Sequence, residues 1–81
     1  MHTSDAISYM IKISGKSRRA FSLDLGNSPW WAAAMVSNHR DSQAGTLSLI
    51  AKECGYTLAC VPSSAVLPDG SLTIDPIQRD K

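Results

Sequence analysis

The sequence has no uninterrupted apolar segment of the roughly 20 residues that a membrane-spanning helix requires. Its first five residues also lack the basic stretch and apolar core of a secretory signal. These two absences argue against a membrane protein and against an exported one. We therefore expect a cytoplasmic protein with no membrane partner.

Cysteine is scarce, with only Cys54 and Cys60 in the chain. Their spacing is not that of a CxxC motif, and no second pair or neighbouring histidine completes a zinc site. A disulfide between them would join the end of one helix to the strand expected just after it, which would constrain little. We expect two reduced cysteines that act as small buried apolar residues, and no metal site.

The sequence also lacks the usual components of an enzyme. It has no glycine-rich phosphate loop, and no pair of carboxylates is set in a pocket. Its many serines have no scaffold that would bring one of them together with a histidine and an acid in a helical domain of 81 residues. We expect no catalytic activity, no catalytic residues and no cofactor.

Charge is present but unevenly distributed. The net charge is only +1, yet residues 1–40 carry five basic against two acidic side chains. Residues 41–81 reverse that balance, with three basic against five acidic. A polyanionic partner would therefore meet the N-terminal half of this single small domain.

Helical periodicity begins close to the N-terminus. Apolar residues recur at helical spacing between residues 6 and 11, after a polar start at residues 3–5, and Gly15 ends that pattern. Ser17 can cap a second, short helix that ends at Gly26. Gly26 suits the left-handed conformation that closes many helices.

Two further helices follow. Ser28 followed by Pro29 predicts the start of a third helix over residues 29–37, because proline in the first helical position loses no hydrogen bond. Three consecutive alanines favour that helix. A fourth helix is predicted over residues 43–53, with Gly55 as its end.

After Gly55 the pattern changes to that of strands. Residues 56–61 and 71–74 are rich in strand formers, and Pro68-Asp69-Gly70 predicts a turn between them. We therefore expect a β-hairpin within residues 56–76, followed by a flexible tail at residues 77–81.

The expected hairpin could serve as a wing on DNA, as a cover for the core, or as a dimer interface formed by strand addition. Asp69, Asp75 and Asp80 argue against a wing, because they would repel phosphate. Exposed strand edges invite pairing, so we favour a homodimer.

The most informative local pattern is a short helix, a glycine-containing turn and another helix. Two helices that cross closely need a small residue at the contact and glycine's conformational freedom at the turn. Ser22, four positions before Gly26, supplies the small residue. The residues expected to face inward are Phe21, Leu25, Ala32 and Met35.

Residues 17–62 resemble the lambda-repressor-like, Xre-type helix-turn-helix family. The motifs that carry the resemblance are Phe21, Leu25-Gly26, Ser28-Pro29, Met35-Val36-Ser37, Thr46-Leu47, Ile50-Ala51 and Gly55-Tyr56. The resemblance implies a mainly α domain of four or five helices, with a DNA-binding core in residues 1–55 that the hairpin extends. It also implies a transcriptional regulator that binds double-stranded DNA in a sequence-specific manner. Such a protein would be nucleoid-associated and encoded by a bacterium or a phage.

The family's DNA-contacting positions can be carried over to this chain one by one. Arg18 begins the second helix, where the family contacts a phosphate. The recognition helix, residues 28–37, would lie in the major groove. Its groove-facing residues are Ser28, Trp30, Ala33 and Ala34. The residues that flank this surface are Lys16, Arg19, Asn27, His39 and Arg40.

The recognition helix departs from the family pattern, because it presents tryptophan and alanine where glutamine, asparagine, arginine or serine is usual. Alanine can touch a thymine methyl but cannot hydrogen-bond to a base. Asn27 and Ser28 are the only nearby amide and hydroxyl. Specificity would then come from thymine methyls, from DNA shape, or from the loop at residues 38–40.

The two adjacent tryptophans leave a second function open. Trp30 and Trp31 cannot both face inward, so we expect Trp31 to be partly buried and Trp30 to lie at the rim, on DNA or in a protein interface. Tryptophan is enriched at interface hot spots. The alternative is therefore a helix-turn-helix fold used as a protein-interaction module, either antitoxin-like or a phage accessory factor, that grips a protein partner through Trp30.

Overall fold

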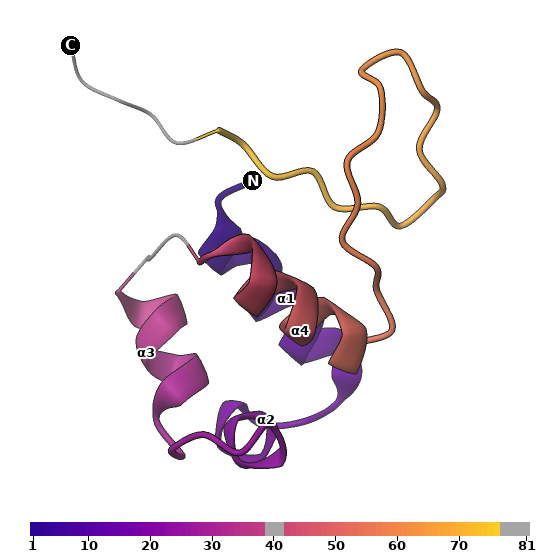
Figure 1. Ribbon diagram of the computed structural model, residues 1–81. Helices are drawn as coiled ribbons and strands as arrows, with labels where there is room; N and C mark the ends of the chain where they lie inside the picture. Colours follow the sequence, from indigo (N-terminus) through magenta and orange to yellow (C-terminus); the bar gives the residue numbers. More distant parts are fainter. Residues whose placement is uncertain (39–41, 77–81) are drawn as a thin grey trace, which may run out of the picture.

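The computed structural model describes residues 1–38 and 42–76, which contain four helices and no strand. These are α1 (Thr3–Ser14), α2 (Arg18–Asp24), α3 (Trp31–Ser37) and α4 (Ala44–Glu53). Helices α1 and α4 lie side by side, and α2 and α3 complete the bundle (Figure 1). The predicted helical core of four or five helices is confirmed as four in the described residues. The predicted flexible tail, residues 77–81, lies outside the described residues.

The first two helices begin and end where local chemistry dictates. Helix α1 starts at Thr3, three residues before its first apolar residue, and His2 Nδ1 caps it by accepting a hydrogen bond from the Ser4 N–H at 3.1 Å. Gly15 ends α1 with φ of +79°. The Ser17 hydroxyl caps α2 by accepting from the Ala20 N–H at 3.1 Å, as predicted.

Helix α3 begins at Trp31, so its predicted start at Pro29 is wrong by two residues. The Trp31 N–H donates to the Ser28 carbonyl at 3.1 Å, which makes residues 28–31 a turn that leads into the helix. Ser28 therefore contributes its carbonyl and not its hydroxyl to the helix start. Its side chain is left exposed to solvent.

The core lies where the four helices meet. Ile7, Phe21 and Ile50, from α1, α2 and α4, are fully buried. Among the four residues predicted to face inward, Phe21, Ala32 and Met35 are buried and Leu25 is half-buried. The helices described here include none that is long and apolar enough to cross a membrane.

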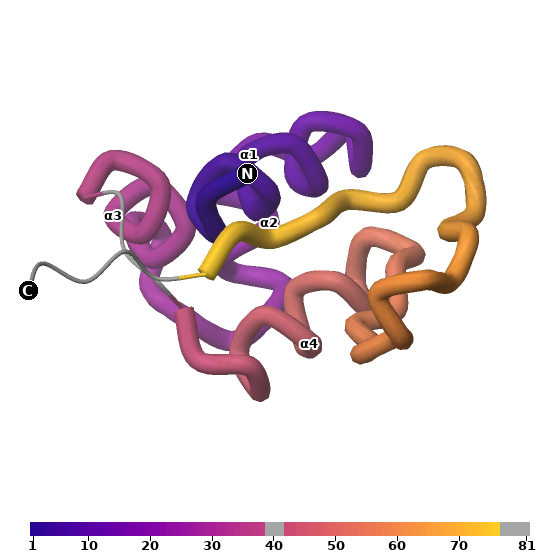
Figure 2. The backbone as a smooth tube through the Cα atoms, turned by 90° about the horizontal axis from the view of Figure 1, so that it is seen from above, coloured from indigo at the N-terminus to yellow at the C-terminus, as the bar shows by residue number. Residues whose placement is uncertain are grey.

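The predicted C-terminal hairpin is wrong. Residues 56–76 form a wide loop without strands, which leaves the end of α4 and returns past the N-terminus (Figures 1 and 2). The Pro68-Asp69-Gly70 turn is present, since the Ser71 N–H donates to the Pro68 carbonyl at 3.2 Å. The Tyr56 hydroxyl ties the start of the loop to this turn by donating to the Gly70 carbonyl at 3.2 Å.

The returning limb, residues 71–76, forms hydrogen bonds and an ion pair with the N-terminal residue. The Met1 amine donates to the Thr73 carbonyl at 2.8 Å and forms an ion pair with Asp75 at 3.0 Å. The Asp75 N–H donates to the Met1 carbonyl at 2.9 Å. An isolated two-stranded hairpin is marginal in water, and the limb makes these contacts in place of the predicted pairing. Tyr56 and Leu72 still pack on the core, so the loop covers one edge of it.

Candidate nucleic-acid interface

A buried serine joins α2 to α3. Ser22 has no exposed surface, and its hydroxyl donates to the Arg18 carbonyl at 2.7 Å. The same oxygen accepts a hydrogen bond from the Ala32 N–H at 2.9 Å. The Ala32 amide lies in the first turn of α3, where helical N–H groups have no partner within the helix. The small residue predicted at this contact therefore also holds α3 against α2.

The turn between these helices closes α2 with a left-handed glycine. Gly26 has φ of +77°, and its N–H donates to the Leu23 carbonyl at 2.9 Å. The Asn27 N–H donates to the Ser22 carbonyl at 3.0 Å. This pair of bonds is the Schellman arrangement, which satisfies carbonyls at the end of a helix and reverses the chain. The predicted glycine corner is confirmed.

Replacing Gly26 by alanine should destabilise the protein by about 1–2 kcal/mol, because an L-residue is strained at positive φ. A Cβ added at Gly26 would meet no atom within 4 Å, so the expected cost comes from the backbone alone. Gly45→Ala is the matched control, since Gly45 lies inside α4 without positive φ and with equal space. Urea unfolding should show Gly26→Ala destabilised and Gly45→Ala unchanged or stabilised. Equal effects at both sites would contradict this explanation.

The outward face of α3 is open to solvent. Trp30 is 69% exposed, and Ser28 and Ala34 are exposed as well. Ala33 is half-buried. Trp31 is half-buried against the core, which confirms the predicted division between the two tryptophans. Three of the four residues predicted to face a groove therefore lie on one accessible surface.

Asn27 is turned toward the corner. Its side-chain amide donates to the Leu25 carbonyl at 3.4 Å, and the residue is half-buried. In this conformation the amide supports the turn and is not presented beside α3. The Ser28 hydroxyl is therefore the accessible polar group at the start of the predicted recognition helix.

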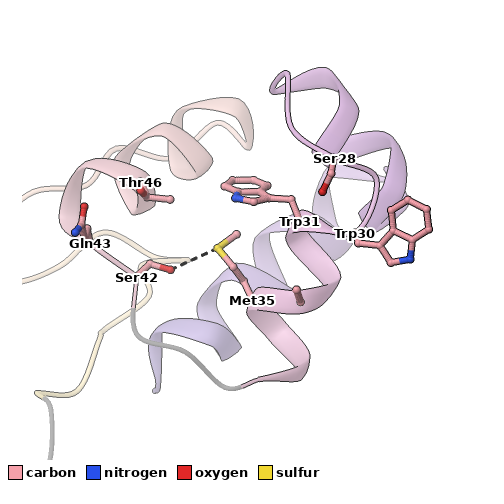
Figure 3. A pocket seen from close by; sticks show the side chains of 8 residues that line it. Ser28, Trp30, Trp31, Met35, Ser42, Gln43 and Thr46 are labelled. Atoms are coloured by element: carbon pink, nitrogen blue, oxygen red, sulfur yellow. Dashed lines mark hydrogen bonds between the residues drawn. The ribbon is translucent and has the colours of Figure 1, made fainter.

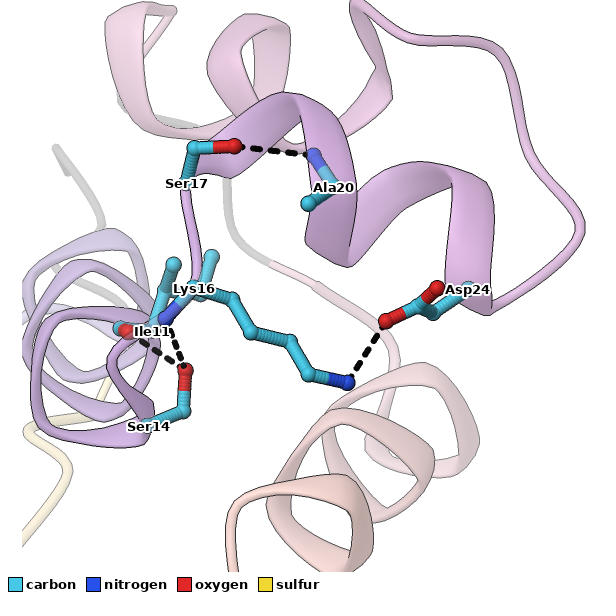
Figure 4. Close-up of polar contacts among 6 residues, drawn as sticks. All are labelled: Ile11, Ser14, Lys16, Ser17, Ala20 and Asp24. Atoms are coloured by element: carbon cyan, nitrogen blue, oxygen red, sulfur yellow. Dashed lines mark hydrogen bonds and ion pairs between the residues drawn. The ribbon is translucent and has the colours of Figure 1, made fainter.

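The predicted basic residues differ in whether their charged groups already have a partner within the protein. Lys16 Nζ lies 2.6 Å from the Asp24 carboxylate (Figure 4), and this hydrogen bond, with the charge attraction, raises the pKa of the Lys16 ammonium. Arg18 donates to the Ser8 hydroxyl at 3.5 Å, the limit of a hydrogen bond. Arg19 is exposed and bonds to no described residue. Arg18 and Arg19 are thus the available cations.

Both arginines lie at the start of α2, the helix that packs on α3. Arg18 is one helical turn before Ser22, about 6 Å along the axis of α2. Ser22 in turn contacts the first turn of α3 directly. The Arg18 side chain itself reaches Ser8 of α1. His39 and Arg40, the other predicted contacts, lie outside the described residues.

A hollow of about 390 Å³ separates α3 from the start of α4. Figure 3 shows Trp31 turned toward α4 and Trp30 turned away from the body of the domain. The Ser42 hydroxyl donates to Met35 Sδ at 3.8 Å across this space. The residues that line the hollow are Ser28, Trp30, Trp31, Ala34, Met35, Ser42, Gln43 and Thr46.

Two of these lining residues, Ser42 and Gln43, were not singled out by the sequence, and Thr46 was named only as part of a family motif. They lie at or just before the start of α4, where the local pattern predicts a helix and no binding role. They join the surface because tertiary packing brings α4 beside α3. No sequence signal marks that proximity.

The cysteines are both free. Cys54 is half-buried beside the core, and burial raises the pKa of its thiol. Cys60 is exposed, so the buried role predicted for it is wrong, because the hairpin that would have covered it does not form. In the part of the chain that is described, no three His, Cys, Asp or Glu residues are grouped to hold a metal.

Comparisons with protein-family models, curated proteins and solved structures find no match to this chain. The resemblance noted for residues 17–62 therefore remains an interpretation of its motifs. Any functional proposal depends on the geometry and chemistry of the α2–α3 unit.

Proposed function

We propose that this protein binds double-stranded DNA in a sequence-specific manner as a helix-turn-helix transcriptional regulator of the lambda-repressor-like, Xre type. Helix α3 and the turn before it, residues 28–37, would enter the major groove. The observation that supports this most strongly is the α2–α3 unit itself. Ser22 and Gly26 hold the two helices at a tight corner while the far side of α3 stays open.

Charge at the start of α2, the helix that packs on α3, supports the same proposal. Arg18 and Arg19 begin α2 and are exposed, and each could contact a backbone phosphate without reading sequence. Such contacts release counterions, so binding should weaken steeply as salt rises. Lys16 would contribute less, because Asp24 already neutralises it.

The regulator would act as a homodimer. Two copies would present their α3 helices to half-sites about one helical turn of DNA apart. The loop after α4 exposes apolar side chains, with Val61 at 53% and Val66 at 97%. The strand edges on which the dimer prediction rested are absent from the described residues, so these exposed side chains are what supports contact with a second copy.

Arg19→Glu should lower affinity for duplex DNA on the order of tenfold, because a lost charge-assisted hydrogen bond is worth about 1.5–3 kcal/mol. The slope of log K against log salt should also become shallower by about one. Fluorescence anisotropy with a labelled duplex, titrated between about 50 and 200 mM salt, measures both quantities.

Lys52→Glu is the matched control for that experiment. It makes the same change of charge at an exposed position in the last turn of α4, away from the residues that line the hollow. Its affinity and salt slope should stay close to those of the unaltered protein. Affinity that does not respond to salt, or an equal loss in both variants, would contradict the proposed interface.

The second candidate function is a protein-interaction module, which the exposure of Trp30 favours. An indole that is 69% exposed and borders a hollow is a suitable anchor for a partner. The two functions differ in what Trp30→Ala removes. It would abolish capture of a protein partner, yet leave phosphate-driven DNA affinity largely intact.

A further inference from the structure

We infer that the α3 face recognises the 5-methyl groups of thymine, so that the protein prefers A·T-rich duplexes through apolar contact. This inference rests on the proposed function, because it assumes that α3 enters the major groove. It names the chemical group that is read there and the residues that read it, Trp30 and Ala34.

The two residues form one apolar strip. They are four positions apart across the start of α3, the spacing that places side chains on the same side of a helix. Both are exposed, and the Trp30 indole projects away from the body of the domain (Figure 3). Ala34 and Trp30 also border the hollow that leads toward α4.

Thymine is the base whose groove edge matches this strip. In the major groove it alone among the four bases presents a methyl group, which apolar side chains contact. Guanine is usually read by arginine or lysine, and residues 31–37 contain neither. The exposed arginines belong to α2 and are suited to phosphates. The face therefore has apolar carbon for thymine and no cation for guanine.

The strength of this contact can be estimated from burial. Removing one methyl-sized group from water contributes about 0.8 kcal/mol, which corresponds to about a fourfold change in affinity. Two contacted methyls would give a preference on the order of tenfold. This preference should be independent of salt, since it does not depend on charge.

The test compares duplexes that differ only in the methyl group. An alternating A·T duplex is compared with the same duplex containing uracil, which keeps every hydrogen-bonding group and removes each methyl. A G·C duplex is compared with its 5-methylcytosine form, which adds a methyl in the major groove. We expect about fourfold tighter binding for each contacted methyl in both pairs, measured by anisotropy at fixed salt.

Protein variants show whether Trp30 makes the distinction. Trp30→Ala should lower the A·T to A·U affinity ratio about fourfold, the share of one contacted methyl, while its salt slope is retained. Tyr9→Ala, which removes an exposed aromatic from α1, should keep the ratio of the unaltered protein. Circular dichroism should show equal helix content in both variants, because neither side chain belongs to the core.

The outcomes separate the inference from the proposed function. Salt-dependent binding with equal affinity for A·T and A·U overturns methyl reading and leaves DNA binding in place. Absence of binding to every duplex overturns the proposed function and this inference together. An A·T to A·U ratio that Trp30→Ala leaves unchanged would overturn the role given to Trp30.

Discussion

Phe21→Ala should lower the free energy of unfolding by about 3–5 kcal/mol, the usual cost of truncating a buried aromatic. Phe21 comes from α2 and is 1% exposed, and it packs in the same cluster as Ile7 of α1 and Ile50 of α4. Its loss would leave a cavity where these helices meet. In so small a domain, this is a large share of the total stability. Urea unfolding followed by circular dichroism measures the change.

Leu23→Ala is the control for the cavity. Leu23 lies on the same helix but is 48% exposed, so its truncation should change stability by no more than about 0.5 kcal/mol. If the two variants unfolded at similar urea concentrations, the arrangement of the core would be wrong. DNA affinity extrapolated to fully folded protein should be unchanged in both, since neither residue lies on the outward face of α3.

Ser22→Val should destabilise the fold by about 3 kcal/mol, for two reasons that act together. The Ala32 N–H would lose its acceptor in a buried place, and the second methyl group of valine would have to fit between α2 and α3. Ser22→Ala separates these causes, because it removes the acceptor without adding volume. It should cost about 1–3 kcal/mol.

The control for Ser22 lies on α4. Ser48 is exposed, so Ser48→Val tests only the lower helix propensity of valine and should cost a few tenths of a kcal/mol, roughly. Thermal unfolding should rank the variants with Ser22→Val least stable and Ser48→Val nearest the unaltered protein. If Ser22→Ala were as stable as Ser48→Val, the hydrogen bond to Ala32 would not be holding α3 in place.

The ends of the helices could be predicted with success wherever one residue determines them. Ser17 caps α2 through its own hydroxyl, and Gly26 and Gly55 take the positive φ that ends a helix. These events involve only neighbours in the chain. The start of α3 could not be placed so well, because the Ser28 carbonyl and hydroxyl were both able to accept from the following turn.

The prediction of the hairpin was wrong because strand pairing, unlike a helix end, depends on residues far apart in the chain. Strand propensity in residues 56–61 and 71–74 says nothing about where their backbone groups find partners. Residues Thr73 and Asp75 bond to Met1 at the other end of the chain. That contact comes from the tertiary arrangement of α1, and it also leaves Cys60 exposed.

The candidate site divides in the same way. Adjacency on one helix was enough to predict that Trp30 and Trp31 face different directions. The ion pair between Lys16 and Asp24 could not be predicted, although the sequence shows both charged residues. Lys16 precedes α2 and Asp24 is its last residue, so their side chains meet only because the chain entering α2 lies beside that helix.

The amino-acid sequence alone determined the four helices, the glycine corner and the composition of the face that α3 turns outward. Those features depend on capping, backbone freedom and periodicity, which act within a few residues. Only the tertiary structure decided that the start of α4 borders α3, that the Ser22 hydroxyl bonds to Ala32, and that residues 56–76 return to Met1. Contacts between residues far apart in the chain depend on how whole helices pack, and no local pattern specifies that.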